Sequence, residues 1–129
     1  MAFVVDEQET RLYVNGVCGL PTARQTEKLH ASLPIDGLWL GARTDEVARG
    51  SLAYLYRGQM DEVRLSRCVR YRDTFKPQSR FESDEETIAL YHCDEGRGNK
   101  LVDSSSNGHD GHVESVTRAI VSSSVFSIE

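Results

Sequence analysis

Gly58-Gln-Met-Asp-Glu-Val-Arg-Leu-Ser66 is the stretch that decides the predicted fold. From Asp61 onward its polar and apolar residues alternate, with Val63 and Leu65 on one face, which is the period of a half-buried β-strand. Met60 breaks the alternation, and a β-bulge beside Asp61 would let both Met60 and Val63 reach the same core. The stretch therefore predicts a kinked, central strand flanked by two acidic residues, although a solvated edge is an equally ordinary place for such a pair.

Short extended segments recur on both sides of this stretch. Residues 10–14 alternate, and Asn15-Gly16 tolerates the positive φ of a tight turn before residues 17–18, so a β-hairpin is predicted. Strands are also predicted at 38–41, with Trp39 as an apolar anchor, and at 87–93, whereas 22–33 is a loop with helical character. Six or seven short strands that do not alternate with long helices predict an all-β protein, an antiparallel β-sandwich.

The composition limits the classes of function. The chain has 129 residues, enough for one domain with a core, and its 15 basic and 20 acidic residues give a net charge of −5. No stretch supplies the basic patch that nucleic acid requires, no apolar run is long enough for membrane insertion, and the first residues do not resemble a signal peptide. Cys18, Cys68 and Cys93 are an odd number without a Cys-x-x-Cys spacing, which favours free thiols and leaves the compartment undetermined.

Three segments together resemble one known family: Leu12-Tyr-Val-Asn-Gly16, the stretch 58–66, and Leu90-Tyr-His-Cys-Asp-Glu-Gly96 followed by Asp103-Ser-Ser-Ser-Asn-Gly108. They are similar to laminin-G-like modules of the concanavalin-A-like lectin and glucanase jelly roll, over residues 3–113. The resemblance implies two facing antiparallel sheets, binding of a glycan or protein, frequent use of calcium, and a place in secreted or cell-surface proteins. We accordingly expect one domain over 1–114 and a tail over 115–129 that either adds strands or stays unpaired.

The order of the motifs differs from the family pattern. The Tyr-His-Cys-Asp-Glu segment that opens the fold in the family lies near the end of this chain. A permuted chain can still close one sandwich, because the first and last strands of such folds are neighbours. The alternative is an incomplete module with an open sheet edge, stable only as a homo-oligomer or as part of a larger protein.

One loop has the spacing of a calcium site. Asp103-x-Ser105-x-Asn107-Gly108, with Glu114 six residues later, nearly satisfies the EF-hand loop pattern, but the predicted strand at 87–93 excludes the helix that would precede an EF-hand. A calcium-supporting loop in a sandwich would use Asp103 and Asn107, with Asp61 as a third ligand. The alternative is that Asp103 and Asn107 hydrogen-bond their own turn.

Zinc and catalysis receive less support. Neighbouring residues of a strand face opposite ways, so His92 and Cys93 cannot easily share a zinc ion, and the spacing of His109 and His112 separates them in an extended chain. Glu62 and Glu95 could form the carboxylate pair of a glycoside hydrolase, but only fold analogy supports that reading. We therefore expect a protein that is not an enzyme.

The leading functional hypothesis is a binding or adhesion module that recognises a glycan or protein through loops at one end of its sheets. Tyr54 and Tyr56 are the predicted ligand-binding residues, because exposed aromatic rings stack on sugars. The incomplete, oligomeric module and the glycoside hydrolase are the alternatives.

Overall fold

The computed structural model describes residues 1–6, 9–19, 38–45, 51–53, 56–118 and 121–128, with the backbone alone described for 43–45, 51–53, 114–118 and 121–128. All regular structure in these residues is β-strand, and every described strand pair is antiparallel, so the predicted all-β class is confirmed. The strands are β1 (Ala2–Val5), β2 (Thr10–Val14), β3 (Val17–Cys18), β4 (Leu38–Leu40), β5 (Arg43–Asp45), β6 (Ser51–Ala53), β7 (Val63–Ser66), β8 (Thr87–Tyr91), β9 (Lys100–Leu101), β10 (Gly111–Arg118) and β11 (Val121–Ile128).

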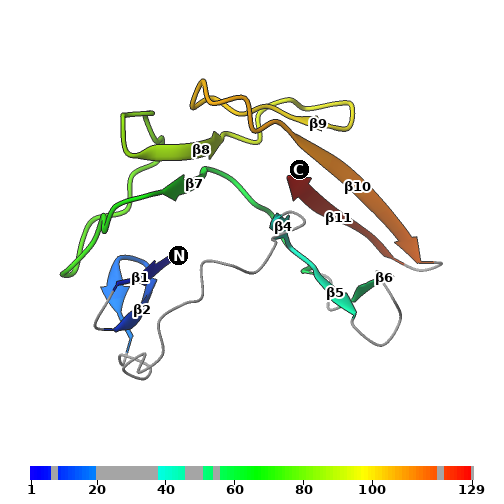
Figure 1. Cartoon of the computed structure of the whole chain (residues 1–129). Coiled ribbons are helices and arrows are strands. Elements are labelled where there is room, and N and C mark those ends of the chain that lie inside the picture. The colour runs from blue at the N-terminus through cyan, green and yellow to red at the C-terminus, as the bar shows by residue number, and fades with distance from the viewer. Residues whose placement is uncertain (7–8, 20–37, 46–50, 54–55, 119–120, 129) are drawn as a thin grey trace.

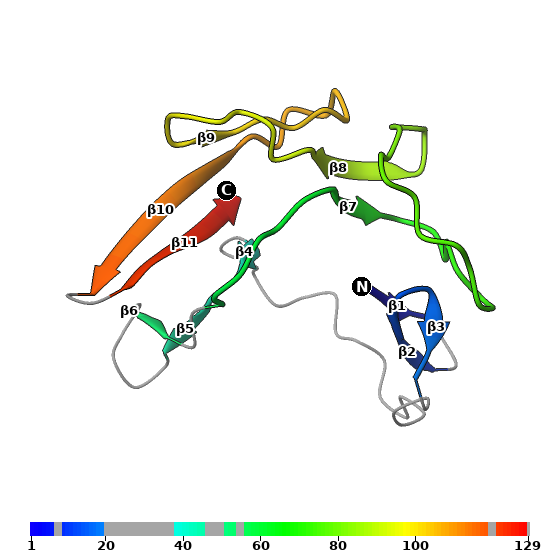
Figure 2. The same ribbon diagram turned by 180° about the vertical axis from the view of Figure 1, so that it is seen from behind.

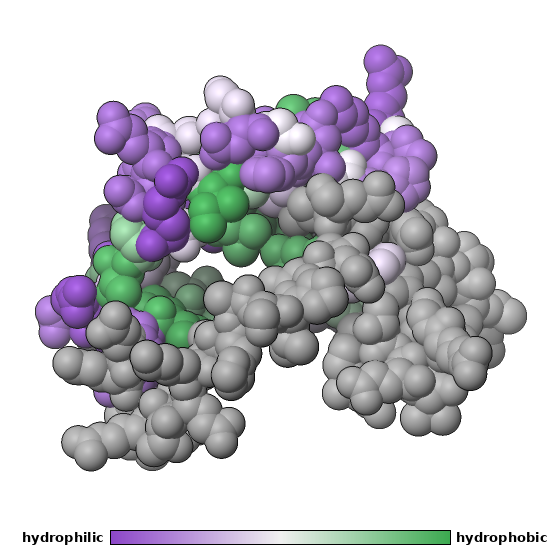
Figure 3. Space-filling model, in the orientation of Figure 1, coloured by the Kyte–Doolittle hydropathy of each residue, from purple (hydrophilic) through white to green (hydrophobic). Residues whose placement is uncertain are grey.

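The strands form four small sheets, whose strand orders are β1-β2-β3, β4-β11-β10-β9, β5-β6 and β7-β8. The sheets follow one another along an open arch, with β7 to β11 in its upper part and β1 to β3 below one end (Figures 1 and 2). Hydrophilic residues cover the upper side of this arch, and apolar residues gather beneath them (Figure 3). Burial of one apolar side of pleated strands therefore organises the described chain.

The hairpin predicted at Asn15-Gly16 is confirmed. Asn15 has φ 52° and Gly16 φ 79°, the two left-handed residues that the tightest hairpin turn needs, and β2 pairs with β3 across them. The buried ring of Tyr13 in β2 contacts Tyr71 and Phe75, whose own rings stack with centroids 3.6 Å apart. These aromatic contacts hold the β1–β3 sheet against the connection between β7 and β8.

The deciding stretch forms a strand, but a shorter one than predicted. β7 begins only at Val63, and Val63 and Leu65 pack against the core as their alternation indicated. The predicted β-bulge beside Asp61 is wrong, because the register of β7 and β8 shifts between Leu65 and Ser66 at the other end of the strand. The predicted central position is wrong as well, since β7 lies in a two-stranded sheet.

The core described by the structure centres on β8 and β9. Ala89, Tyr91 and Leu101 are each at most 1% exposed and form one cluster. Leu90 is equally buried on the other side of β8, whereas Ile88 on that same side is 38% exposed, so only the end of this strand is covered on both faces. Partly buried apolar residues from β4, β7 and β10 and from the chain after β8 complete the cluster: Leu38, Leu40, Val63, Leu65, Cys93 and Val113.

The predicted tail contains strands. β10 runs from 111 to 118, across the predicted boundary at 114, and β11 returns antiparallel to it and pairs with β4. Of the two outcomes expected for the tail, the addition of strands is therefore the one observed. The segment 22–33 lies outside the described residues, and within those residues no helix is long and apolar enough to cross a membrane.

Candidate functional site

A pocket opens where β7 and β8 part. Val63 and Tyr91 are their last register pair at this end, and the next residues on each chain include Glu62 with φ 53° and Cys93 with φ 57°. Left-handed backbone is costly for residues other than glycine, by about 1 to 2 kcal/mol each, so two such residues at one place mark a constrained junction. They redirect both chains and leave a space between them.

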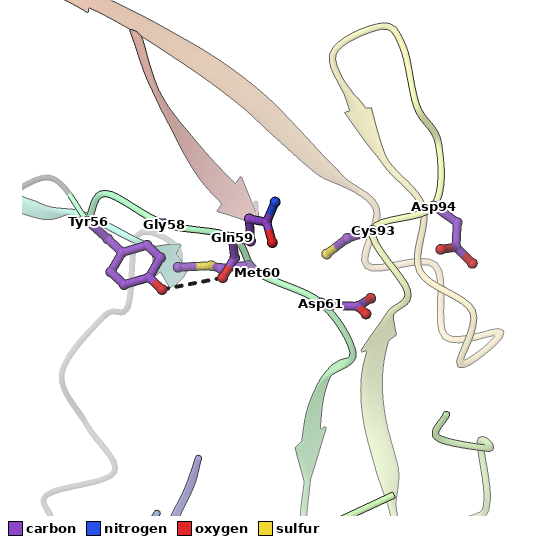
Figure 4. A pocket seen from close by; sticks show the side chains of 7 residues that line it. All are labelled: Tyr56, Gly58, Gln59, Met60, Asp61, Cys93 and Asp94. Atoms are coloured by element: carbon purple, nitrogen blue, oxygen red, sulfur yellow. Dashed lines mark hydrogen bonds between the residues drawn. The ribbon is translucent and has the colours of Figure 1, made fainter. Parts of the chain in front are cut away.

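The pocket has a volume of about 450 Å³, within the range of small-molecule sites, about 300 to 1,000 Å³. One wall is the segment that precedes β7, and the other is the segment that follows β8. The Cys93 sulfur points toward the first wall, whereas the Met60 side chain runs toward Tyr56 (Figure 4). The lining residues are Tyr56, Gly58, Gln59, Met60, Asp61, Cys93 and Asp94.

Tyr56 is the aromatic residue of this pocket. Its side chain is 47% exposed, and its hydroxyl donates to the carbonyl oxygen of Gln59 at 3.3 Å (Figure 4). The ring lies directly against Gly58, where an added Cβ would come within 2.4 Å of the tyrosine hydroxyl oxygen. The backbone N–H of Tyr56 donates to Gly41 at 2.7 Å, which anchors this wall to the turn after β4. Glycine at position 58 thus permits the observed position of the ring.

Two carboxylates face the pocket in different electrostatic states. Asp94 accepts a charge-assisted hydrogen bond from Arg80 at 2.5 Å. Asp61 is exposed and has no hydrogen-bond or ion-pair partner within the described part of the chain. Asp61 therefore brings an acceptor without a direct hydrogen bond to the pocket, and the charge of Arg80 acts on it from a longer distance.

The thiol of Cys93 is neutral at physiological pH. Burial, together with the negative charges of Glu95, Asp61 and Asp94, raises the pKa of the Cys93 thiol to about 11. It lines the pocket as a small, polarisable group instead of a nucleophile.

Glu62 follows the pocket residue Asp61 in the chain, does not line the pocket, and has a network of its own. Its carboxylate accepts from the backbone N–H of Phe81 at 2.7 Å and lies 2.9 Å from His92 Nδ1 and 3.1 Å from Arg80. Burial alone would raise the pKa of Glu62, but these hydrogen bonds and the Arg80 charge lower it below its ordinary value. The Glu95 carboxylate, the other half of the predicted hydrolase pair, accepts from the backbone N–H of Val102 at 2.7 Å. Both carboxylates thus hold backbone segments in place.

The predicted calcium ligand Asp103 is turned inward, with 9% exposure. One of its oxygens accepts from the backbone N–H groups of Leu90 and Ser105, both within 3.0 Å, and the other accepts from the Ser105 hydroxyl at 2.8 Å and the His109 N–H at 3.0 Å. A cation at this carboxylate would have to compete with those donors. Calcium binding by Asp103, Asn107 and Asp61 stays a prediction.

Asn107 completes a polar cap on the free edge of β8. Its amide donates to the carbonyl oxygens of Thr87 and Ile88 at 2.9 and 3.0 Å, and the Ser104 N–H donates to the carbonyl oxygen of Leu90 at 2.7 Å. The Ser105 hydroxyl oxygen lies 3.1 Å from the Ile88 oxygen. The loop thereby satisfies backbone groups that an edge strand leaves open. The alternative that Asp103 and Asn107 bond their own turn is observed, and the turn is also bonded to the neighbouring strand.

The structure brings together only part of the predicted site. Tyr56 and Asp61 line one pocket, while Asp103 and Asn107 are not among its lining residues, and Tyr54 lies outside the described residues. Among the described residues no group of three or more His, Cys, Asp or Glu side chains is arranged to hold a metal ion. Sequence reasoning missed Gly58, Gln59, Met60, Cys93 and Asp94 as pocket residues. Cys93 and Asp94 could not be found from the sequence, because only the pairing of β7 with β8 brings them beside the segment that precedes β7.

Comparison with protein-family models, with curated proteins and with solved structures gave no match for this chain. The resemblance to laminin-G-like modules therefore remains a prediction that rests on the motifs of the sequence.

Proposed function

We propose that this protein is a non-enzymatic module that binds a glycan in the pocket between the segments flanking β7 and β8. The observation that carries the proposal is the exposed ring of Tyr56 in a pocket that also holds the carboxylates of Asp61 and Asp94. The apolar C–H face of a sugar ring packs on an aromatic ring, and sugar hydroxyls donate to carboxylates. The fold proposed with it is a concanavalin-A-like antiparallel β-sandwich, supported by the all-antiparallel strand pairing.

A glycan fits this pocket better than a protein surface does. A pocket of about 450 Å³ with one aromatic ring and a few polar groups matches the anatomy of a small-ligand site. A protein partner would instead require a wide, well-packed area of about 800 Å² on each side. The glycan is therefore the first ligand class to test.

The test is a glycan array followed by titration calorimetry on the oligosaccharide that binds best. Tyr56→Ala is expected to weaken binding about tenfold, corresponding to about 1.4 kcal/mol, because the stacking surface is lost. Val102→Ala is the matched control, since it shortens an exposed apolar residue that does not line the pocket. Gly58→Ala should weaken binding as well, because its methyl group displaces the Tyr56 ring. An array without binding, or an affinity that Tyr56→Ala leaves unchanged, contradicts the proposal.

A second candidate function is self-association, favoured by one face of the β1–β3 sheet. Register and alternation place six uncharged residues on this face: Phe3, Val5, Thr10, Leu12, Val14 and Val17. Phe3, Val14 and Val17 are more than half exposed, so the face offers apolar area to water.

The proposed occupant of this face is a second copy of the chain. Each copy carries a net charge of −5, so two copies can associate only through a surface that keeps their carboxylates apart. The six residues of this face include no carboxylate. Among the described strands, β1 and β3 are the edge strands of their sheet, and an edge strand can pair with a strand of another copy.

A further inference from the structure

β7 is bonded to a neighbouring strand along one edge only. Among the described strands it belongs to a two-stranded sheet, and β8 lies along one of its edges (Figures 1 and 2). The outer edge of β8 is closed by hydrogen bonds from the loop 103–109, whereas no described strand closes the outer edge of β7. An extended segment of another chain can add to an open edge as a further strand.

The hydrogen bonds of β8 show which backbone groups of β7 face outward. The Leu90 N–H donates to Asp103 at 3.0 Å and the Leu90 carbonyl accepts from Ser104 at 2.7 Å, so both groups point away from β7. Arg64 is opposite Leu90 in the antiparallel register, and the backbone groups of such a pair point away from each other. The N–H and C=O of Arg64 therefore face the open edge, and neither has a hydrogen bond within the described part of the chain.

The side chains of β7 give the two sides of this edge different chemistry. Val63 and Leu65 are partly buried against the core cluster. Arg64 lies on the other side, with its guanidinium 4.4 Å from the ring centroid of Phe81 and 3.4 Å from the Tyr71 hydroxyl. Both of these partners are uncharged, and Arg64 has no ion pair with any described residue. A carboxylate can therefore pair with Arg64 without breaking an existing ion pair.

These groups define the sequence of a strand that would add at this edge. The residue opposite Arg64 would exchange two main-chain hydrogen bonds with it, and the two side chains would lie on the same side of the sheet, about 5.5 Å apart at their Cα atoms. A cross-strand pair of opposite charges is favourable, so this residue should be Asp or Glu. The residues before and after it would lie on the side of Val63 and Leu65, which favours apolar residues such as Val.

The chain itself does not contain this pattern. None of its 20 Asp and Glu residues has an apolar residue on both sides. Two β7 strands that paired through Arg64 would instead place two guanidinium groups opposite each other, which is unfavourable. Both observations favour a segment of another protein over a second copy of this chain.

We propose that the open edge of β7 binds an extended segment of a partner protein, in which an Asp or Glu opposite Arg64 lies between two apolar residues. The proposed glycan site is separate, because Arg64 does not line the pocket. β7 also lies outside the β1–β3 sheet, so this edge is distinct from the face proposed for self-association.

The probe is the peptide Ser-Thr-Val-Glu-Val-Thr-Ser-amide with fluorescein at its N-terminus, titrated by fluorescence polarisation at low ionic strength. Replacement of its Glu by Gln is expected to weaken binding about two- to fivefold, the range of an exposed ion pair. N-methylation of the same Glu removes the N–H that would bond to the Arg64 carbonyl and should weaken binding about tenfold or more. Both changes are made in the peptide, so they leave the folding of the protein unaffected.

Arg64→Gln should abolish the preference for the Glu peptide over the Gln peptide. Arg72→Gln is the matched control, because Arg72 is exposed and lies in the connection between β7 and β8, and it should retain the preference. Hydrogen exchange in the wild type tests the main-chain bonds without a substitution. Binding of the Glu peptide should slow exchange of the Arg64 amide and leave that of Leu65, which faces β8, unchanged.

Four results would each overturn the inference. They are the absence of binding by the Glu peptide, equal binding of the N-methylated peptide, a preference that Arg64→Gln retains, and exchange of the Arg64 amide that the Glu peptide does not slow. None of them bears on glycan binding, which the array tests separately.

Discussion

Gly16 occupies a position that no other residue fills without strain. Its φ of 79° is left-handed, and an added Cβ would lie 1.8 Å from the carbonyl oxygen of Phe75. The Gly16 carbonyl also accepts from the Phe75 N–H at 2.9 Å, so the hairpin turn is bonded to the connection between β7 and β8. A side chain here would oppose both the turn and this contact.

Gly16→Ala is accordingly expected to lower the free energy of unfolding by about 3 kcal/mol or more, the sum of left-handed strain and the forced displacement of Phe75. Gly108→Ala separates the two effects, because Gly108 has the same φ of 79° but an added Cβ there meets nothing within 4 Å. The Gly108→Ala control should lose only about 1 to 2 kcal/mol of unfolding free energy. Urea denaturation measures this loss in both variants. Equal losses in the two variants would show that the Phe75 contact does not form in solution.

At the residue scale, the sequence predicts what depends on near neighbours. Asn15-Gly16 was identifiable because both residue types favour left-handed backbone at successive positions. Glu62 and Cys93 share that backbone without belonging to those types, so no local signal predicts them. Their conformation follows from the contacts that hold the two chains apart beyond the β7–β8 pairing.

At the scale of elements, the loop from Asp103 to His109 acts as the missing neighbour of β8. Asp103 accepts from Leu90, and Asn107 donates to Thr87 and Ile88, so the edge of the strand is paired by side chains instead of by another strand. The calcium prediction arose because oxygen-bearing side chains at alternate positions serve metal binding and backbone capping equally well. Only the position of β8 beside the loop distinguishes the two uses.

Removal of the Asp103 carboxylate should therefore unpair buried backbone donors. Asp103→Ala is expected to cost about 3 kcal/mol of unfolding free energy at pH 7, whereas Asp73→Ala, at an exposed aspartate, should cost little. Burial alone would raise the pKa of Asp103, but the N–H and hydroxyl donors bonded to it lower that pKa below its ordinary value. The ionised Asp103 carboxylate thus stabilises the fold above about pH 4, and this stabilisation is lost as the pH falls through the lowered pKa of Asp103. The difference in unfolding free energy between wild type and Asp103→Ala should therefore narrow in acid.

Thermal melts of these two variants and the wild type, recorded from neutral to acidic pH, check this expectation. A difference that stays constant down to about pH 2 would contradict the role of the ionised carboxylate. The same samples with calcium or a chelator test the calcium prediction: a melting temperature that the ion raises in wild type but not in Asp103→Ala would support it, and an unchanged melting temperature would remove it.

At the scale of the whole molecule, sequence predicts the class of the fold better than its pairing. Period-two alternation places Val63 and Leu65 on one buried side of their strand, and the structure confirms it. Alternation did not show that Ala89 and Tyr91 are the residues of β8 that meet them in that core. The pairing of β11 with β4 joins segments more than 80 residues apart. Alternation shows which side of a strand is apolar, but it does not show which distant strand is its partner. The strands of the tail were ambiguous for the same reason, because their partners lie far away in the chain.

The uncharged face of the β1–β3 sheet makes its own prediction at this scale. If two copies meet through this face, the mass measured by sedimentation should rise with concentration from that of a monomer to that of a dimer. Val14→Lys places a charge at a position that is 54% exposed and opposite Val17 in the register, and two copies would then bring like charges together. The variant should remain monomeric and keep its melting temperature, since this side chain contributes little to the core. Val102→Lys adds the same charge at an exposed apolar residue outside this face and should dimerise as the wild type does. A wild type that stays monomeric at high concentration, or a Val14→Lys variant that dimerises equally well, excludes this face as the interface.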